Sequence, residues 1–197
     1  MTSKADAIRE HLISTQPGIE RWLAEHDAIE PLEPSGVPPI IALPRIVVRQ
    51  MLSGKASQTI IDRAEKLASE QGLPYFAALS EVDLLGCGLS RAKAATVKRF
   101  ADAYESCPQA IEAWQGMSAS ELLVTIKKHK GIGEWTASIL AMFHLGHEDI
   151  FPLGDNTLRK TIMRMADQGV VIIPERATPY RTYLAAYLWQ FADQNRI

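Results

Sequence analysis

The sequence predicts an all-α fold, and three observations support this prediction. Apolar residues recur at a helical spacing of three or four in several segments along the 197 residues. Residues that favour helix N-termini, Ser90, Ser118 and Asp155, stand directly before three of these segments. No segment shows a convincing strand-like alternation. The hydrophobic content of 47% suits one sizeable core, or two small lobes that share a cleft.

The N-terminal part is expected to carry two helices, at 3–14 and 18–26, joined around Pro17. Residues 31–39 hold four prolines and cannot form a regular helix, so they form a linker or a strapped loop. We therefore expect residues 1–39 to pack, as two helices and a Pro-rich strap, on a single compact unit of residues 40–197.

The rest of the chain is expected to contain further helices. The apolar segment 40–52 forms the first, and the helix after it ends at Gly72. Two short turns cover 73–85, and a glycine-rich break at 86–88 precedes a long helix from Ser90 to about Tyr104. A short helix follows Pro108, Ser118 opens another, and the stretch 174–193 is interpreted as one helix.

The most informative stretch runs from 122 to 165. Two helical patterns flank Gly131-Ile132-Gly133. Glycines can adopt backbone angles that other residues rarely adopt, so this segment is predicted to be a tight turn. The unit is therefore predicted to be helix, hairpin, helix. Unpaired amides at such a turn and at the start of the next helix favour an anion such as phosphate. Lys127, Lys128 and Lys130 beside the turn suit a polyanion.

About twenty residues further on, Pro152 and Gly154 break the chain and Asp155 stands at the start of another helix. A carboxylate at this position is a natural N-cap. It is also suited to be a catalytic anion at the mouth of a pocket.

Composition limits the function classes. A net charge of −2 counts against a bulk nucleic-acid binder, although basic residues cluster before and after the hairpin. No apolar run approaches the roughly 20 residues that cross a bilayer, and the charged N-terminus lacks the apolar core of a signal peptide. We expect a soluble intracellular protein, cytoplasmic or nuclear, with no membrane partner.

The segments KGIGEWTASIL and DIFPLGDNTLRK together resemble the signature of the helix-hairpin-helix (HhH-GPD) base-excision DNA glycosylases, and among them the DNA-3-methyladenine glycosylase II type. The resemblance covers about residues 40–195. It implies the helix-hairpin-helix glycosylase fold, with two helical lobes and a cleft between them. It also implies excision of alkylated purines from double-stranded DNA by hydrolysis of the N-glycosidic bond, which leaves an abasic site.

The resemblance assigns roles to individual residues. Asp155 is the expected catalytic carboxylate, and Met51 is the wedge that fills the gap left by an extruded base. A segment similar to the family's Gly-Leu-x-x-x-Lys makes Arg91 and Lys93 candidates for minor DNA contacts. The expected base pocket contains Trp135, Trp189 and Gln50, and the expected DNA-backbone contacts are Lys130, Gly131, Gly133 and Thr136. Candidate ligands of a structural monovalent cation are the main-chain carbonyls of Lys127, His129 and Gly131.

One carboxylate is enough for this chemistry, because an alkylated purine already carries positive charge and leaves without a general acid. A cationic base over tryptophan gains about 0.5–2 kcal/mol of cation–π attraction. Trp135 stands where lyase-competent relatives carry a lysine nucleophile, so a monofunctional enzyme is expected. No cofactor is expected, because Cys87 and Cys107 cannot supply the roughly four thiolates of an iron–sulfur cluster.

The chain also departs from the family pattern. Lys130 replaces the usual proline of the hairpin, and Ile139 and Asn156 stand where relatives can carry tyrosine, which shifts the expected base range. We expect a monomer. Two alternatives stay open from the residues alone: a non-catalytic helix-hairpin-helix module in which Asp155 is only an N-cap, and an α-helical scaffold whose glycine turn binds nothing.

Overall fold

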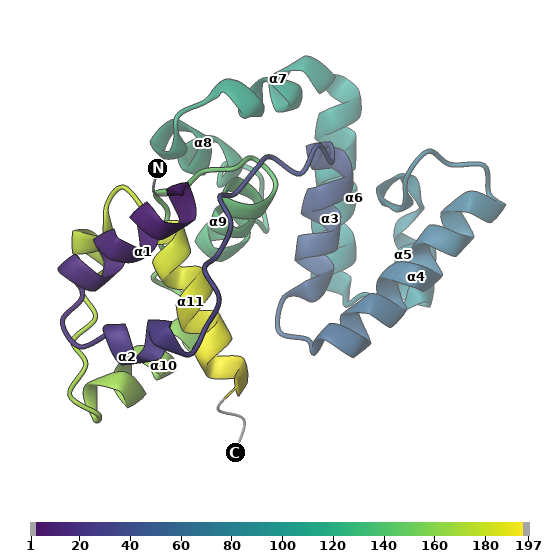
Figure 1. Ribbon diagram of the computed structural model, residues 1–197. Coiled ribbons are helices and arrows are strands. Elements are labelled where there is room, and N and C mark those ends of the chain that lie inside the picture. The colour runs from purple at the N-terminus through teal and green to yellow at the C-terminus, as the bar shows by residue number, and fades with distance from the viewer. Residues whose placement is uncertain (1–2, 195–197) are drawn as a thin grey trace. The chain divides into compact units, whose positions relative to one another are not determined.

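The computed structural model describes residues 3–194, which form helices and loops with no strand among them (Figure 1). The all-α prediction is therefore confirmed for this part of the chain. The elements are α1 (Lys4–Thr15), α2 (Glu20–Ala24), α3 (Pro39–Arg49), α4 (Gly54–Glu70), η1 (Phe76–Ala78), α5 (Glu81–Cys87), α6 (Arg91–Ser106), α7 (Pro108–Glu112), η2 (Ala113–Gly116), α8 (Ala119–Ile126), α9 (Glu134–Phe143), α10 (Asn156–Ala166), η3 (Pro174–Ala177) and α11 (Arg181–Gln194).

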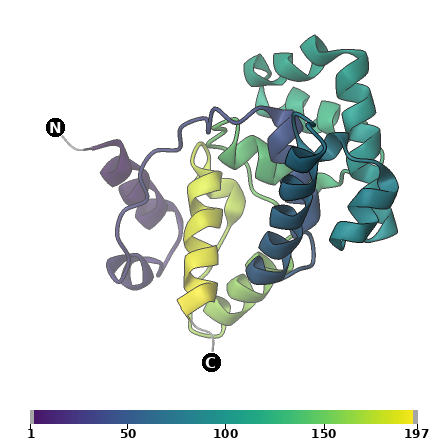
Figure 2. The ribbon, with the colours of Figure 1, turned by 90° about the vertical axis from the view of Figure 1, so that its right-hand side faces the viewer.

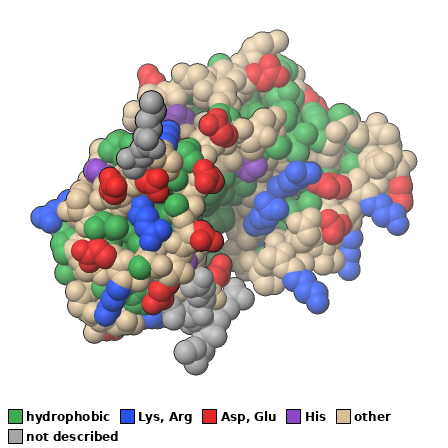
Figure 3. Space-filling view, in the orientation of Figure 1, with side chains coloured by type: hydrophobic (Ala, Val, Ile, Leu, Met, Phe, Trp, Pro, Cys, Tyr) green, Lys and Arg blue, Asp and Glu red, His purple; other side chains and the backbone are tan. Residues whose placement is uncertain are grey.

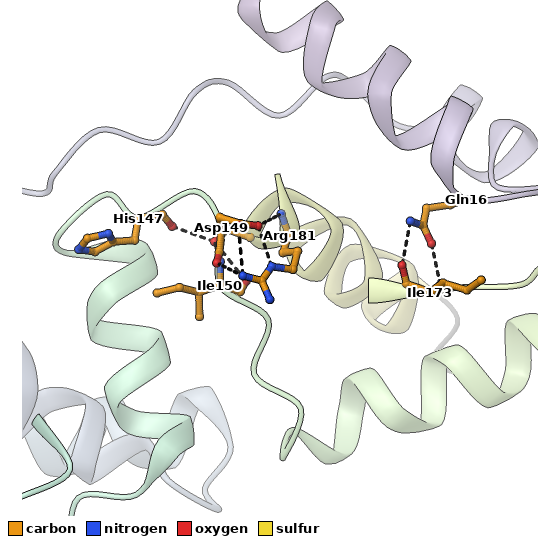
Figure 4. A network of polar contacts seen from close by, with 7 residues as sticks. Gln16, His147, Asp149, Ile150, Ile173 and Arg181 are labelled. Carbon is orange, nitrogen blue, oxygen red and sulfur yellow. Dashed lines mark hydrogen bonds and ion pairs between the residues drawn. The ribbon is translucent and has the colours of Figure 1, made fainter. Parts of the chain in front are cut away.

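The helices pack in two compact units. The terminal unit comprises Met1–Glu33 with Gly146–Ile197, and the hairpin unit comprises Pro34–Leu145. This division differs from the expected one, in which residues 40–197 formed one compact unit. The N-terminal helices join the last third of the chain because α1 packs on η3 and Gln16 binds both main-chain groups of Ile173, at 2.7 and 3.0 Å (Figure 4).

In the hairpin unit α3 is the central helix. Eight of its 11 residues are buried, which is typical of a helix surrounded by others. It packs against α4, α6 and α9, and Figures 1 and 2 both show α3 beside α6. Gln50 ends this helix and Met51 follows in a turn, so the predicted helix 40–52 stops at Arg49.

In the terminal unit α10 packs beside α11, and Tyr183 and Tyr187 of α11 lie in the core. The buried hydroxyl of Tyr183 accepts the Leu32 N–H at 2.9 Å, and that of Tyr187 accepts the Ile29 N–H at 3.0 Å. The chain before the Pro-rich strap is thereby fastened to α11.

Most predicted helix starts are confirmed, because Ser90, Ser118 and Asp155 each cap a helix with their side chain. The helix predicted over 174–193 is wrong at its start. Residues 174–177 form a 3-10 turn, Thr178 is extended with ψ 133°, and α11 begins at Arg181. The reason is Pro179, because a residue that precedes proline is disfavoured in the α conformation.

Hydrogen bonds and an ion pair join the start of α11 to the loop that leads to Asp155 (Figure 4). Arg181 donates to the Asp149 carboxylate at 2.7 Å, and this bond raises the pKa of Arg181. The buried Thr182 hydroxyl donates to the His147 carbonyl at 2.8 Å and accepts the Ile150 N–H at 3.1 Å. The loop and the helix that carries Trp189 are therefore held together.

Acidic and basic side chains are interspersed on both units in the face shown in Figure 3. This pattern agrees with the small net charge of −2. Among residues 3–194, no helix combines the length and the apolar character that crossing a membrane requires.

Candidate functional site

The hairpin connects α8 to α9 through residues 127–133, as predicted. Gly131 has φ +95°, and a Cβ there would lie 2.1 Å from the Thr96 hydroxyl oxygen, so only glycine fits. Gly133 has an ordinary φ of −89°, and a Cβ there would meet no atom within 4 Å. The expectation that both glycines use angles closed to other residues is therefore wrong for Gly133.

The start of α9 is suited to an anion. Gly133 is its N-cap and provides no side-chain cap, and the first-turn amides of a helix have no intrahelical partner. Gly131, Gly133 and Lys130 are exposed at this end. Lys127, in contrast, pairs with Glu134 at 3.3 Å, so part of the predicted basic cluster is already neutralised within the hairpin.

The side chain of Thr136 points into the protein. Thr136 is buried, and its hydroxyl accepts a hydrogen bond of 2.6 Å from the side-chain amide of Gln50. A phosphate contact of Thr136 would therefore involve its main-chain N–H. The same bond ties the end of α3 to the first turn of α9.

The three carbonyls expected to hold a cation lie in the hairpin turn. The carbonyl of His129 accepts the Ile132 N–H at 3.0 Å. The His129 ring packs edge-on against Phe100 and Trp114, and burial lowers the pKa of this ring. Among the described residues, no group of three His, Cys, Asp or Glu side chains is arranged to bind a metal ion. Cys87 is buried, Cys107 is exposed, and both are free thiols.

Met51 has the geometry of a projecting side chain. Its backbone lies in the left-handed region, at φ +56°, and its side chain is 95% exposed. A non-glycine residue in this conformation costs on the order of 1–3 kcal/mol and persists only where its surroundings hold it. An exposed apolar side chain on a strained turn is typical of a functional contact rather than of the core.

Asp155 lies at the N-terminus of α10 and is half-buried. Its Oδ1 accepts two hydrogen bonds, from the Leu158 N–H at 2.8 Å and from the indole N–H of Trp189 at 3.3 Å. The first bond is the predicted N-cap, and the second brings together two residues that the sequence placed in one site. The carboxylate is therefore oriented by two fixed donors at the positive end of a helix.

The candidate residues gather as two groups, one in each unit. The hairpin unit brings Gln50 to Thr136 and places the half-buried Trp135 as the second residue of α9. The terminal unit brings Asp155 to Trp189. Ile139 is half-buried on α9 and Asn156 is exposed as the first residue of α10. The ammonium of Lys93 donates to the carbonyls of Gln50 and Val48 at 2.6 and 2.8 Å, a position that no spacing pattern in the sequence signals.

The chain is similar to known proteins in sequence and in fold. No family model matches the chain. The chain is 30% identical over 164 residues to DNA-3-methyladenine glycosylase 1 of Schizosaccharomyces pombe, covering 77% of this chain and 72% of that protein. It is 30% identical over 165 residues to the alkylbase DNA glycosidase-like protein mag2 of the same yeast, covering 77% of each.

The fold has a solved counterpart in the same organism. The 3-methyladenine DNA glycosylase Mag1, solved in complex with abasic DNA, superposes with a TM-score of 0.79 at 24% identity. The superposition covers 95% of this chain and 97% of that one.

Proposed function

We propose a mechanism for this chain from one premise: it belongs to the helix-hairpin-helix family of DNA-3-methyladenine glycosylases. The chain is thus a DNA repair enzyme that hydrolyses N-glycosidic bonds. The proposal concerns which residues carry the reaction, which bases are released and what product remains.

Asp155 is the catalytic carboxylate. As the base leaves, positive charge develops on the deoxyribose, and a fixed carboxylate stabilises that transition state without having to reorganise. The single observation that carries this assignment is the pair of hydrogen bonds on Oδ1 from Leu158 and Trp189. They hold the carboxylate in one orientation, which is what electrostatic stabilisation needs.

The substrates are purines made cationic by alkylation. A base that already carries positive charge needs no acid to protonate it, which suits a site with one assigned carboxylate. The indole of Trp189 is held at Asp155 in the terminal unit, and Trp135 is half-buried at the start of α9 in the hairpin unit. The face of a tryptophan attracts a cationic ring by about 0.5–2 kcal/mol.

Double-stranded DNA is held by its backbone and opened by a wedge. The N-terminus of α9 and the exposed Gly131 and Gly133 receive a phosphate through main-chain N–H groups. Met51 enters the space from which the base is rotated, a step that costs a few kcal/mol. Trp135 has no amine to form an imine, so the product is an intact strand with an abasic site.

Release of free base tests the proposal. The purified protein is incubated with duplex DNA that has been methylated by an alkylating agent, and the supernatant is analysed for 3-methyladenine. We expect 3-methyladenine in the supernatant and an alkali-sensitive abasic site in the DNA. Salt-dependent binding to the duplex without any released base would instead support the non-catalytic module, in which Asp155 is only an N-cap.

A further inference from the structure

The peptide bond between Gln50 and Met51 controls where Met51 points. A flip of this peptide plane changes ψ of Gln50 and φ of Met51 together, by about 180°. Such a flip would bring φ of Met51 from +56° to a negative value, outside the left-handed region, and so relieve its strain. Whatever fixes the Gln50 carbonyl therefore also fixes the strained conformation.

Lys93 holds that carbonyl. Its ammonium donates to the Gln50 carbonyl oxygen at 2.6 Å and to the Val48 carbonyl oxygen at 2.8 Å. Both carbonyls belong to the end of α3, where the last carbonyls lack helical partners and a positive charge is favourable. The main-chain bonds at this end are longer, 3.4 Å from the Gln50 N–H and 3.3 Å from the Leu52 N–H.

The position of Lys93 is itself well defined. It is the third residue of α6, and its N–H donates to the hydroxyl of the N-cap Ser90 at 3.4 Å. Its side chain lines a cavity of about 120 Å³ beside Val48 and Leu52, and burial lowers the pKa of its ammonium. The charge is therefore drawn from solvent toward the two carbonyls instead of lying free on the surface.

We propose that Lys93 is a positioning residue that locks the Gln50–Met51 peptide plane and thereby keeps Met51 projecting toward DNA. This inference rests on the proposed wedge function of Met51. It replaces the expectation that Lys93 makes a minor contact with the DNA itself.

The test compares three variants with the wild type. Lys93→Met removes the ammonium and keeps an apolar stem, and Lys93→Arg keeps a donor with positive charge. Lys66→Met makes the same lysine-to-methionine change at an exposed position of α4. Amide hydrogen exchange of Met51 and Leu52 is measured in the free protein. Single-turnover release of 3-methyladenine and binding to undamaged duplex over a salt series are measured on the same preparations.

For Lys93→Met we expect exchange at Leu52 to rise at least about tenfold and base release to slow by about tenfold, with an unchanged salt dependence of binding. Lys93→Arg should restore most of the exchange protection at Leu52 and most of the rate of base release. Lys66→Met should change neither exchange nor single-turnover release. If Lys93→Met unfolds, as judged by a thermal melt, Lys93→Gln takes its place in the same comparison.

Unchanged exchange in Lys93→Met would overturn the inference. So would a loss of affinity for undamaged duplex with a shallower salt dependence, because that is the behaviour of a phosphate contact. Exchange in the free protein does not depend on catalysis. A wild-type protein that releases no base would therefore refute the proposed function, while the exchange result would still decide the role of Lys93.

Discussion

The side-chain amide of Gln50 donates a hydrogen bond of 2.6 Å to the hydroxyl of Thr136. Gln50 ends α3 and precedes Met51, whereas Thr136 lies in the first turn of α9. The bond therefore ties the turn that carries the proposed wedge to the helix that begins at the hairpin. Within the hairpin unit, the segment proposed to bind the DNA backbone and the segment proposed to enter the duplex are one connected structure.

Replacing Met51 with alanine should slow base release more than it weakens binding. Met51 is 95% exposed, so the change should leave stability nearly unaltered. Contacts between a side chain and unstacked bases are worth about 1–3 kcal/mol, and about 1.4 kcal/mol corresponds to a tenfold change in rate. Single-turnover release and affinity for undamaged duplex are measured with Val82→Ala, an exposed residue of α5, as the control. Equal rates for Met51→Ala and the wild type would remove the wedge role.

A negative charge at Gly133 should weaken binding to every duplex, damaged or not, because phosphate contacts carry no sequence information. Space exists for a side chain at this position, so Gly133→Ala is a matched control for Gly133→Asp. Both variants add a Cβ and only one adds charge. Affinities are measured for undamaged and methylated duplexes at two salt concentrations. A Gly133→Asp protein that lost affinity for methylated DNA alone would contradict the phosphate-binding role of the hairpin.

Stability should fall as the pH is lowered through the histidine range. Burial lowers the pKa of His129, His144 and His147, so below about pH 6.5 the unfolded chain binds protons that the folded chain does not. The free energy of unfolding should therefore decrease between about pH 7.5 and 5.5. Carboxyl groups with lowered pKa titrate below this window.

Urea denaturation at both pH values measures the effect, and His129→Phe provides the comparison. Phenylalanine keeps an aromatic ring against Phe100 and Trp114 but does not titrate. The variant should show a weaker pH dependence than the wild type. An identical dependence in both proteins would show that His129 does not contribute.

Borohydride should trap no covalent adduct between the protein and damaged DNA. The family resemblance places Trp135, which carries no amine, at the position of the lyase nucleophile. Trp135→Ala should lower release of methylated purines more than it lowers affinity for undamaged duplex. A trapped adduct in the wild type would refute the monofunctional mechanism, and unchanged release by Trp135→Ala would leave Trp135 as a packing residue of the hairpin.

Local features of the fold could be predicted from the sequence because they depend on neighbouring residues. The caps at Ser90, Ser118 and Asp155 and the helices around the hairpin are of this kind. The sequence predicts a helix from residue 174, although Pro179 signals the later start of α11 at Arg181. Which residues make up each of the two units could not be predicted, because this depends on contacts such as Gln16 to Ile173, which are 157 residues apart.

In the candidate site, too, local features could be predicted and long-range contacts could not. The local turn predicts the need for glycine at Gly131. The sequence does not show that a Cβ there would also collide with the Thr96 hydroxyl of α6. The resemblance predicts Lys93 as a minor DNA contact, and sequence spacing does not show that its ammonium reaches the carbonyls of Val48 and Gln50. The bond from Trp189 to Asp155 joins residues 34 positions apart, and the sequence alone could place them in one site only through the family resemblance.

The most direct test of the central claim is release of 3-methyladenine from methylated duplex DNA by Asp155→Asn. Asparagine is as good an N-cap as aspartate, so α10 should keep its start and the thermal melt should change little. Without the negative charge, the developing positive charge on the sugar has no partner, which should cost several kcal/mol of barrier, at about 1.4 kcal/mol per tenfold. We expect base release to be abolished while DNA affinity is kept or increased. Near-normal release by a folded Asp155→Asn protein would contradict the assignment of Asp155 as the catalytic carboxylate.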